Sequence, residues 1–281
     1  MAHILIFGLG YTAKVLAERL RADGWTIRAT GRDGDLGFTD RAAVESALAG
    51  ASHVLSSVPP DPAGRDPVLD AYRGTLTGKW VGYLSSTGVY GDTGGAWVDE
   101  SAPLAGFGGS GRRTARAEAD RAWQAVGAHV FRLPGIYGPG RSPLDRVASG
   151  AAHRIDLPGQ VFSRIQVEDI ARGVIAGFAA PAGVYNLADD LPASHNAVIE
   201  EACRLLGREP PPLLSFEQAN LSAMARAFYA ENRRVANGKA RRVLGWSPLY
   251  PTYVAGLRAL SATISPASAS APPPAASAVQ R

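Results

Sequence analysis

The sequence predicts an α/β protein with a doubly wound parallel sheet and a smaller mixed part toward the carboxyl terminus. Short apolar runs of strand length alternate with segments whose apolar residues recur at helical spacing. A glycine-rich turn joins the first apolar run to the first helical segment. Because such alternation requires parallel strands connected by right-handed crossovers, the doubly wound arrangement is the expected fold.

Composition excludes several classes of protein. The chain has 281 residues, 46% of them hydrophobic, which is too apolar for intrinsic disorder. Cys203 is the single cysteine, so no disulfide framework or cysteine zinc cluster is expected, and the five histidines lack metal-site spacing. The net charge of +4 is dispersed, so nucleic acid is not an expected partner. Without a long apolar run or an export signal after Met1, we expect a soluble cytoplasmic protein with no membrane contact.

The amino-terminal thirty residues carry the strongest pattern. His3–Phe7 has strand length, and Ala13, Leu16, Ala17 and Leu20 follow at helical spacing, with Gly24 ending that helix. Further strands are expected at 26–30, 54–58, 80–85, 129–133 and 184–187, and further helices at 42–48 (with Asp40 as N-cap), 114–126, 167–178 and 196–206.

Three regions are expected along the chain. Residues 1–166 form the strand–helix core, and 167–260 form a smaller part packed on the carboxyl edge of the sheet, where α/β proteins bind ligands. Residues 261–281 are almost entirely Ala, Ser and Pro, which leaves little apolar surface to offset the entropy of ordering. We expect that segment to be a disordered tail.

The turn Gly8-x-Gly10-x-x-Ala13 lies between a strand and a helix, which is the context of a dinucleotide-binding Rossmann fold. Gly8 permits the tight turn, Gly10 lets the backbone approach a pyrophosphate, and Ala13 keeps helix and strand close. The helix N-terminus then offers free N–H groups to the phosphates. The alternative is a glycine turn that merely links strand to helix.

The end of the second strand indicates which dinucleotide is bound. An acidic residue there typically holds a ribose 2′-hydroxyl, whereas an arginine accommodates a 2′-phosphate. This strand ends without a carboxylate, and Arg28, Arg32 and the Thr30 hydroxyl are available. NADP(H) is therefore favoured over NAD(H), although Asp33 and Asp35 lie close enough to reverse the preference.

Several motifs resemble the extended short-chain dehydrogenase/reductase superfamily, and more narrowly its NAD-dependent epimerase/dehydratase branch. The similarity covers about residues 3–260. The motifs are Ser-Ser-Thr-Gly-Val-Tyr-Gly-Asp at 85–92, Asp-Glu at 99–100, Ala-Glu at 117–118, Arg-Leu-Pro-Gly-Ile-Tyr-Gly-Pro-Gly at 132–140, Val-Glu-Asp-Ile-Ala at 167–171, Val-Tyr-Asn-Leu at 184–187 and Leu-Gly-Trp at 244–246.

The resemblance implies roles for individual residues. Ser86 would polarise the substrate oxygen, and Tyr137 is the other candidate catalytic residue, while Tyr90 is expected to pack. The glycine-rich segment 106–111 would form a mobile loop over the substrate. The implied cofactor contacts are Gly8, Leu9, Gly10, Tyr11, Thr12, Arg32, Ser57, Val58, Pro59, Ser85, Pro134 and Ile136. The candidate clamp for an anionic substrate is Arg112, Arg113, Arg141 and Arg164, and the segment 231–234 belongs either to the substrate pocket or to surface ion pairs.

One family feature is missing. The catalytic pair of the family is a Tyr with a Lys four residues later, yet 101–123 contains neither residue type. Counting back from Glu118 puts the pair at Ser110 and Thr114, and counting back from Asp120 puts it at Arg112 and Arg116. None of these side chains is a phenol suited to proton transfer near neutral pH.

Two functions are therefore carried forward. The first is an NAD(P)-binding oxidoreductase or epimerase with an altered catalytic group, acting on a small substrate that is polar, sugar-like or anionic. The alternative is a non-catalytic NADP(H) sensor whose bound cofactor alters a partner contact. No metal site is expected, and homodimer formation is left open.

Overall fold

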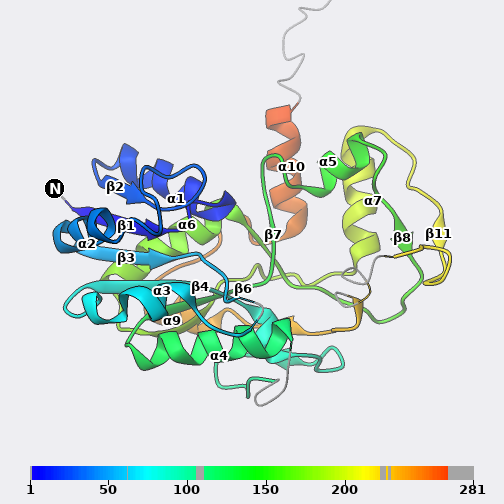
Figure 1. The fold of residues 1–281 in the computed structure, drawn as a ribbon. Coiled ribbons are helices and arrows are strands. Elements are labelled where there is room, and N and C mark those ends of the chain that lie inside the picture. Colours follow the sequence, from blue (N-terminus) through cyan, green and yellow to red (C-terminus); the bar gives the residue numbers. More distant parts are fainter. Residues whose placement is uncertain (1, 62, 106–110, 222–225, 227–228, 265–281) are drawn as a thin grey trace, which may run out of the picture.

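A computed structural model describes residues 2–61, 63–105, 111–221, 226 and 229–264 (Figure 1). Its centre is a sheet of six strands, all parallel, in the order β10-β6-β4-β3-β1-β2. The strands are β1 (His3–Phe7), β2 (Thr26–Ala29), β3 (His53–Ser56), β4 (Trp80–Ser86), β6 (His129–Leu133) and β10 (Gly183–Asn186). The predicted doubly wound sheet is confirmed, and its strand order reverses between β1 and β3, where such sheets bind ligands.

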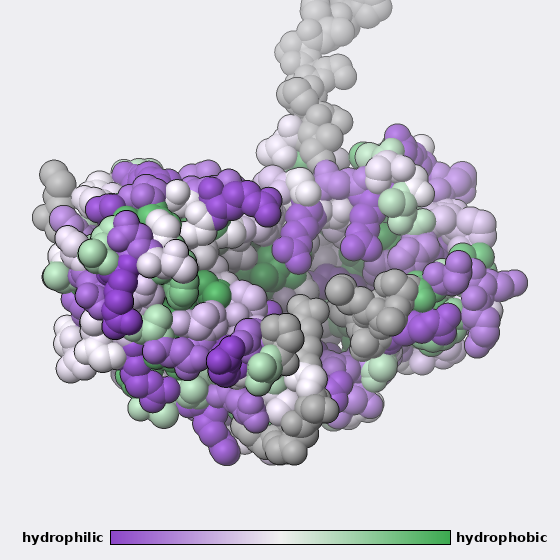
Figure 2. All heavy atoms as spheres, in the orientation of Figure 1, coloured by the Kyte–Doolittle hydropathy of each residue, from purple (hydrophilic) through white to green (hydrophobic). Residues whose placement is uncertain are grey.

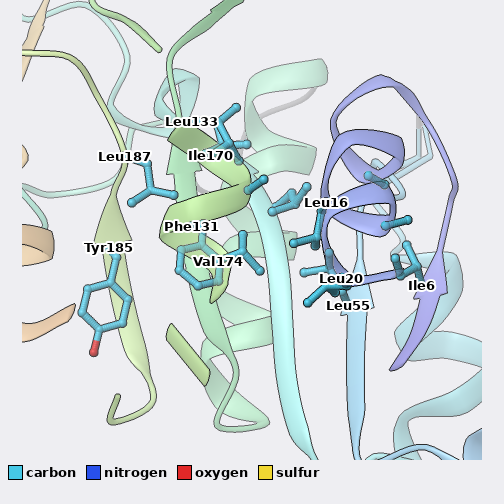
Figure 3. Packing of buried hydrophobic residues seen from close by; sticks show 14 of the residues in the cluster. Ile6, Leu16, Leu20, Leu55, Phe131, Leu133, Ile170, Val174, Tyr185 and Leu187 are labelled. Atoms are coloured by element: carbon cyan, nitrogen blue, oxygen red, sulfur yellow. The ribbon is translucent and has the colours of Figure 1, made fainter. Parts of the chain in front are cut away.

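Helices cover both faces of this sheet. One face packs against α1 (Tyr11–Ala22), α6 (Val167–Ala176) and α9 (Gly238–Leu244), and the other against α2 (Arg41–Gly50), α3 (Pro67–Tyr72) and α4 (Arg112–Ala125). Figure 3 shows the first interface, in which apolar side chains of α1 and α6 pack with those of the strands. The labelled residues are Ile6, Leu16, Leu20, Leu55, Phe131, Leu133, Ile170, Val174, Tyr185 and Leu187.

A second part lies beside the sheet, on the right of Figure 1. Its core joins α5 (Pro143–Ala148), α7 (His195–Leu206) and α10 (Tyr253–Ile264). Three parallel two-stranded pairs complete the fold: β5 (Trp97–Val98) with β12 (Arg234–Val235), β7 (Gly135–Tyr137) with β9 (Arg164–Gln166), and β8 (Arg154–Ile155) with β11 (Leu213–Leu214). Short 3₁₀ helices are η1 (Arg73–Thr75), η2 (Thr87–Tyr90) and η3 (Gly177–Ala179). Within the described residues, no helix combines the length and apolar character needed to cross a bilayer.

Local sequence signals place the first elements correctly. The four apolar residues predicted to face the core from α1 are its buried residues, and Gly24 follows the helix with a φ of +79°. Asp40 caps α2 by accepting a hydrogen bond from the Ala43 N–H at 3.1 Å. Periodicity and capping therefore suffice where the partner of a helix is the neighbouring strand.

Other elements differ from the expectation. Helix α10 continues through Ile264, so the first four residues of the predicted tail, 261–264, are helical; residues 265–281 lie outside the described residues. The predicted helix 167–178 changes to 3₁₀ geometry after Ala176. Most of the predicted loop 106–111 also lies outside the described residues, since the description resumes at Gly111.

A buried ion pair ties α4 to the sheet. Arg132 on β6 donates from Nε and Nη2 to the two carboxylate oxygens of Asp120, at 3.0 and 2.8 Å, and both side chains are almost fully buried. Ser85 at the end of β4 donates to the same carboxylate at 2.6 Å. Arg132 Nη1 donates to the Tyr90 hydroxyl, which donates to the Asn186 side chain at 2.8 Å. The ends of β4, β6 and β10 are thus held to one another and to α4 just beneath the carboxyl edge.

We predict that Asp120→Ala lowers the free energy of unfolding by about 3–5 kcal/mol, because it leaves the Arg132 charge buried and unpaired. Urea unfolding followed by circular dichroism measures the change. The exposed pair Arg41–Glu45 on α2 is the control, and Glu45→Ala there should change stability little. Equal losses for the two variants would contradict the role given to the buried pair.

Candidate functional site

The glycine turn after β1 is fixed by hydrogen bonds from its neighbours. The Gly8 N–H donates to Thr30 Oγ1 at 3.1 Å, and the Leu9 N–H donates to the Thr30 carbonyl at 2.8 Å. From the end of β3, Ser57 Oγ donates to the Gly8 carbonyl at 2.6 Å. Gly8 has a φ of +84°, and a Cβ there would lie 3.0 Å from Val58 Cγ2. The turn therefore sits where the strand order reverses, packed too closely for a side chain at Gly8.

The N-terminus of α1 opens at this turn. Gly10 is its N-cap, no side chain caps it, and no acidic residue lies in its first turn. The Tyr11 hydroxyl donates to the Pro139 carbonyl at 3.1 Å, and the Arg141 guanidinium lies 5.6 Å from the Tyr11 ring centre. Thr12 is half-buried beside them. The arrangement offers backbone N–H groups and a partial positive charge to an anion.

The segment after β2 lies against the glycine turn and carries the charges relevant to the cofactor. Asp33 pairs with Lys14 at 2.6 Å, and Asp35 pairs with Arg28. The hydrogen bond from Lys14 lowers the pKa of the Asp33 carboxyl. Arg32 is exposed and has no hydrogen bond or ion pair within the described part of the chain. Both candidate carboxylates are thus paired with cations, whereas Arg32 is available.

Ser86 and Pro134 meet at the carboxyl edge of the sheet. Ser86 is the last residue of β4 and is in register with Leu133, the residue before Pro134. The Ser86 hydroxyl is half-buried and accepts a hydrogen bond from the Gly88 N–H at 3.1 Å, which leaves its proton free to donate. Pro134 lines a pocket at this edge. Figure 2 shows a mainly hydrophilic face, with hydrophobic residues in the hollow between the two parts of the protein.

The remaining predicted cofactor residues divide between the core and the surface. Leu9 and Ile136 pack partly against the apolar cluster that includes β1, α1 and α6. Pro59 is exposed and follows Val58, beside the glycine turn.

Two hydroxyls expected at the cofactor lie in the interior instead. Thr30 is 1% exposed, and its hydroxyl holds the Gly8 N–H rather than reaching toward a phosphate. Ser85 is 4% exposed, and its hydroxyl is directed at Asp120. A strand alternates its side chains between two faces, so Ser85 and Ser86 point in opposite directions and only Ser86 remains at the edge.

The geometry does not support Tyr137 as a catalytic residue. Its side chain packs in the cluster of α5, α7 and α10, and a Cβ at Gly256 would lie 2.0 Å from its hydroxyl oxygen. That oxygen is buried without a hydrogen-bond partner in the described residues, and burial raises the pKa of the phenol. Tyr90 packs as expected, and burial raises its pKa to about 12. Neither phenol is placed to exchange protons near neutral pH.

The expected arginine clamp does not form as a unit. Arg164 is nearly buried and donates to the backbone carbonyls of 162, 193 and 194, so its guanidinium is already occupied. Arg141 lies over Tyr11 near the glycine turn, and Arg113 pairs with Glu231. The Arg112 side chain lies outside the described part of the structure. Of the positions considered for the catalytic pair, Thr114 is buried on α4, Arg116 lies on the same helix, and Ser110 is outside the described residues.

Sequence reasoning missed Asp189, which follows β10 at the carboxyl edge. Its Oδ1 accepts a hydrogen bond from the Leu191 N–H at 3.3 Å, and its Oδ2 is buried without a partner in the described residues. Burial raises the pKa of this carboxyl to about 8, although the charge of Arg164 opposes the shift. Its position after a parallel strand was the available signal, but the burial came from the packing of other segments.

We predict that Tyr137→Phe keeps the protein folded and raises the free energy of unfolding by about 1 kcal/mol, because it removes a buried hydroxyl without a partner. Chemical denaturation of the two proteins measures the change. A destabilisation above about 1 kcal/mol would show that the hydroxyl has a partner that the packing does not reveal.

The raised pKa of Asp189 makes stability depend on pH. Because folding raises the carboxyl pKa from 3.8 to about 8, the folded state retains a proton that the unfolded state has lost. This contribution to stability is fully present below pH 3.8 and is lost as pH rises through about 8. We predict that Asp189→Asn unfolds at a higher temperature than wild type at pH 8 but not at pH 4. The same difference in melting temperature between the variant and wild type at pH 8 and at pH 4 would contradict the prediction.

Comparisons with known proteins identify relatives of this chain in sequence and in structure. No family model matches the chain. A conserved protein of unknown function from Silicibacter pomeroyi DSS is 43% identical, with a TM-score of 0.83 over 94% of this chain and 99% of its own. Protein YeeZ of Escherichia coli K12 is 28% identical over 252 residues, which is 75% of this chain and 86% of YeeZ. A Streptomyces protein named 3-diazoavenalumate denitrifying reductase is 28% identical over 178 residues, 57% of this chain and 58% of its own.

More distant solved structures share the fold. The human epimerase family protein SDR39U1, solved with NADPH, has a TM-score of 0.71 at 17% identity over 92% of this chain and 97% of its own. The dTDP-glucose 4,6-dehydratase of Bacillus anthracis, in complex with NAD, has a TM-score of 0.71 at 16% identity over 93% of this chain and 96% of its own. The chain therefore belongs to the same family as the Silicibacter pomeroyi protein, and it has the fold of extended short-chain dehydrogenases/reductases of the NAD-dependent epimerase/dehydratase type.

Proposed function

We propose that the protein is an oxidoreductase of the extended short-chain type that uses NADP(H) and acts on a small polar substrate. The observation that carries the proposal is the Gly8–Gly10 turn between β1 and an uncapped α1, at the point where the strand order reverses. The reductase named among the relatives and the NADPH complex of a structural neighbour support the same class of chemistry.

The turn has room for a pyrophosphate. At Gly10 no atom lies within 4 Å of the position that a Cβ would take, and the residue is exposed. At Gly31, by contrast, a Cβ would lie only 3.1 Å from the Leu9 nitrogen, because the chain at Gly31 lies close against the turn. A pyrophosphate in front of Gly10 would receive hydrogen bonds from the N-terminus of α1. Tyr11 and Thr12 would border it.

The preference for NADP(H) rests on the charges beside this turn. Asp35 also accepts a hydrogen bond from the Ala29 N–H at 2.7 Å, so it is held by the backbone as well as by Arg28. Asp33 is held by Lys14. Arg32 is left to form a charge-assisted hydrogen bond with a ribose 2′-phosphate.

The nicotinamide would lie between Pro134 and Ile136 on one side and Ser86 on the other. When bound, the cofactor supplies or accepts a hydride. Ser86 accepts from the Gly88 N–H and can donate its own proton in a hydrogen bond to a substrate oxygen. In a reduction, that bond would stabilise the negative charge that develops on the oxygen.

We predict that NADPH binds more tightly than NADH, and that Arg32→Ala weakens NADPH binding by about 10- to 100-fold with little effect on NADH. The range corresponds to the loss of a hydrogen bond to a charged group, about 1.5–3 kcal/mol. Fluorescence titration gives both dissociation constants. Arg204→Ala, which removes an exposed arginine on the distant α7, is the control.

The results test the NADP(H) preference and distinguish an enzyme from a non-catalytic NADP(H) sensor. Equal wild-type affinities for the two cofactors, unchanged in Arg32→Ala, would refute the NADP(H) preference. Tight NADPH binding without transfer of deuterium from 4-deuterated NADPH to any carbonyl compound in a broad panel would favour the regulatory alternative. For a substrate that is reduced, Ser86→Ala should lower kcat by at least tenfold and leave the NADPH dissociation constant unchanged.

A further inference from the structure

A pocket opens at the carboxyl edge of the sheet, where Pro134 and Gly135 follow β6. Its empty volume, counted together with the space at its mouth that is open to solvent, is about 390 Å³, and no residue of the glycine turn lines it. Its lining residues are Thr87, Pro134, Gly135, Val161, Phe162, Ser163, Glu231, Arg233 and Val235. Because Thr87 follows Ser86 directly, the pocket adjoins the place proposed for the reacting end of the substrate.

Glu231 and Arg233 line this pocket because the residue between them, Asn232, is hydrogen-bonded to two other segments, at Gly95 and at Gly159. Asn232 accepts the Gly95 N–H on its carbonyl at 2.9 Å and donates from its side chain to the Gly159 carbonyl at 3.0 Å. The next residues form β12 and pair with β5. Hydrogen bonds to two neighbouring segments therefore hold this wall of the pocket.

Arg233 lines the pocket and has an unused pair of N–H donors. Its side chain is 17% exposed, and its Nη1 is occupied by Glu231 and by the Gly91 carbonyl, the latter at 2.7 Å. In the described part of the chain, its Nε and Nη2 have no hydrogen bond. These two nitrogens form one edge of the guanidinium, with the spacing that a carboxylate can bridge with both oxygens.

Two hydroxyls add to the donors of the pocket. Ser163 Oγ accepts the Val235 N–H at 2.9 Å, so its own proton is available. The Thr87 hydroxyl has no hydrogen bond within the described residues. Since a hydroxyl can donate as well as accept, both can serve an anionic oxygen beside Arg233.

The charged lining residues of the pocket are Glu231 and Arg233, which form an ion pair. Glu231 is its acidic lining residue, and it is shared by Arg113 and Arg233. The two charged lining residues therefore cancel, and the feature that favours an anion is the pair of Arg233 N–H donors that this ion pair leaves unused. A ligand that supplies only hydrogen-bond acceptors would complement these donors and the two hydroxyls.

We propose that this pocket binds a carboxylate through the free edge of Arg233, with hydrogen bonds from Thr87 and Ser163. That this ligand is the substrate rests on the function proposed above. The substrate would then be a small carboxylic acid. The apolar walls at Val161, Phe162 and Val235 suit a compact apolar body behind the charged group.

Benzoate is a suitable probe, with benzyl alcohol as its neutral counterpart and phenyl phosphate as the alternative anion. Ligand-observed NMR titration of the full chain at constant ionic strength measures binding of each. We expect benzoate to bind at least tenfold more tightly than benzyl alcohol and more tightly than phenyl phosphate. Absence of benzoate binding, or a preference for phenyl phosphate, would overturn the carboxylate assignment.

Arg233→Lys tests the role of the guanidinium edge, because it keeps the positive charge and removes the bidentate donor pair. We expect it to weaken benzoate binding by at least tenfold. Arg234→Lys is the matched control, since Arg234 is directed to the Gly95 carbonyl and does not line the pocket. Glu231→Gln, which removes the competing acceptor charge, should tighten benzoate binding several-fold. Equal benzoate affinities in the two arginine variants would overturn the proposal.

NADPH titration of the same variants distinguishes a failure of the carboxylate pocket from a failure of the proposed function. Arg233→Lys should bind NADPH as wild type does, which also shows that the variant is folded. Benzoate binding without NADPH binding in wild type would refute the proposed function and leave the carboxylate pocket standing. NADPH binding without benzoate binding would refute the pocket alone.

Discussion

The buried pair of Asp120 and Arg132 is the interaction on which the ligand-binding edge depends. Two charges removed from water are tolerated only when each is paired and its remaining hydrogen bonds are satisfied. Asp120 accepts from Arg132, Ser85 and Gln124, and Arg132 also donates to Tyr90. The requirement to satisfy every member fixes α4 and the ends of three strands in one arrangement.

In that arrangement, the region proposed for the cofactor and the region proposed for the substrate lie on two sides of the edge. On one side of the edge, the glycine turn and the segment ending at Arg32 would receive the proposed cofactor. On the other side, η2 begins directly after Ser86, and Arg233, the residue before β12, donates to the Gly91 carbonyl just after η2. Ser86 lies between the two regions with a free hydroxyl proton. A hydride donor and a small acid would therefore meet beside a residue able to hydrogen-bond the reacting oxygen.

The sequence predicted what depends on near neighbours. The spacing of apolar residues in α1 and the cap at Asp40 follow from local geometry, and alternating strands and helices imply the parallel sheet. Pairs such as β7–β9 and β8–β11 have only two or three residues per strand, too few to show a period. Their partners are set by the packing of distant segments. The bounds of helix α10 were not predicted for the same reason, since its core contacts are with α5 and α7.

Among the candidate site residues, too, those set by local backbone geometry were the predictable ones. The glycines of the turn were predicted from backbone geometry, and Gly8 has the positive φ that a tight turn requires. Ser85 and Tyr137 were assigned from the resemblance and Thr30 from its hydroxyl, and all three lie in the interior. Which hydroxyl faces a ligand depends on the strand face and on the buried partners available to it. The role of Arg233 was left open between pocket and surface because its free edge becomes apparent only when Gly91 and Glu231 are seen to occupy Nη1.

A crystal structure with NADP⁺ and benzoate bound together is the most direct test of this account. It predicts the pyrophosphate at Gly8–Gly10, the 2′-phosphate on Arg32, and the carboxylate on the Nε–Nη2 edge of Arg233, within reach of Thr87 and Ser163. A dinucleotide bound away from the glycine turn would contradict the proposed function. A carboxylate bound elsewhere, with the Arg233 edge turned into the protein, would contradict the pocket.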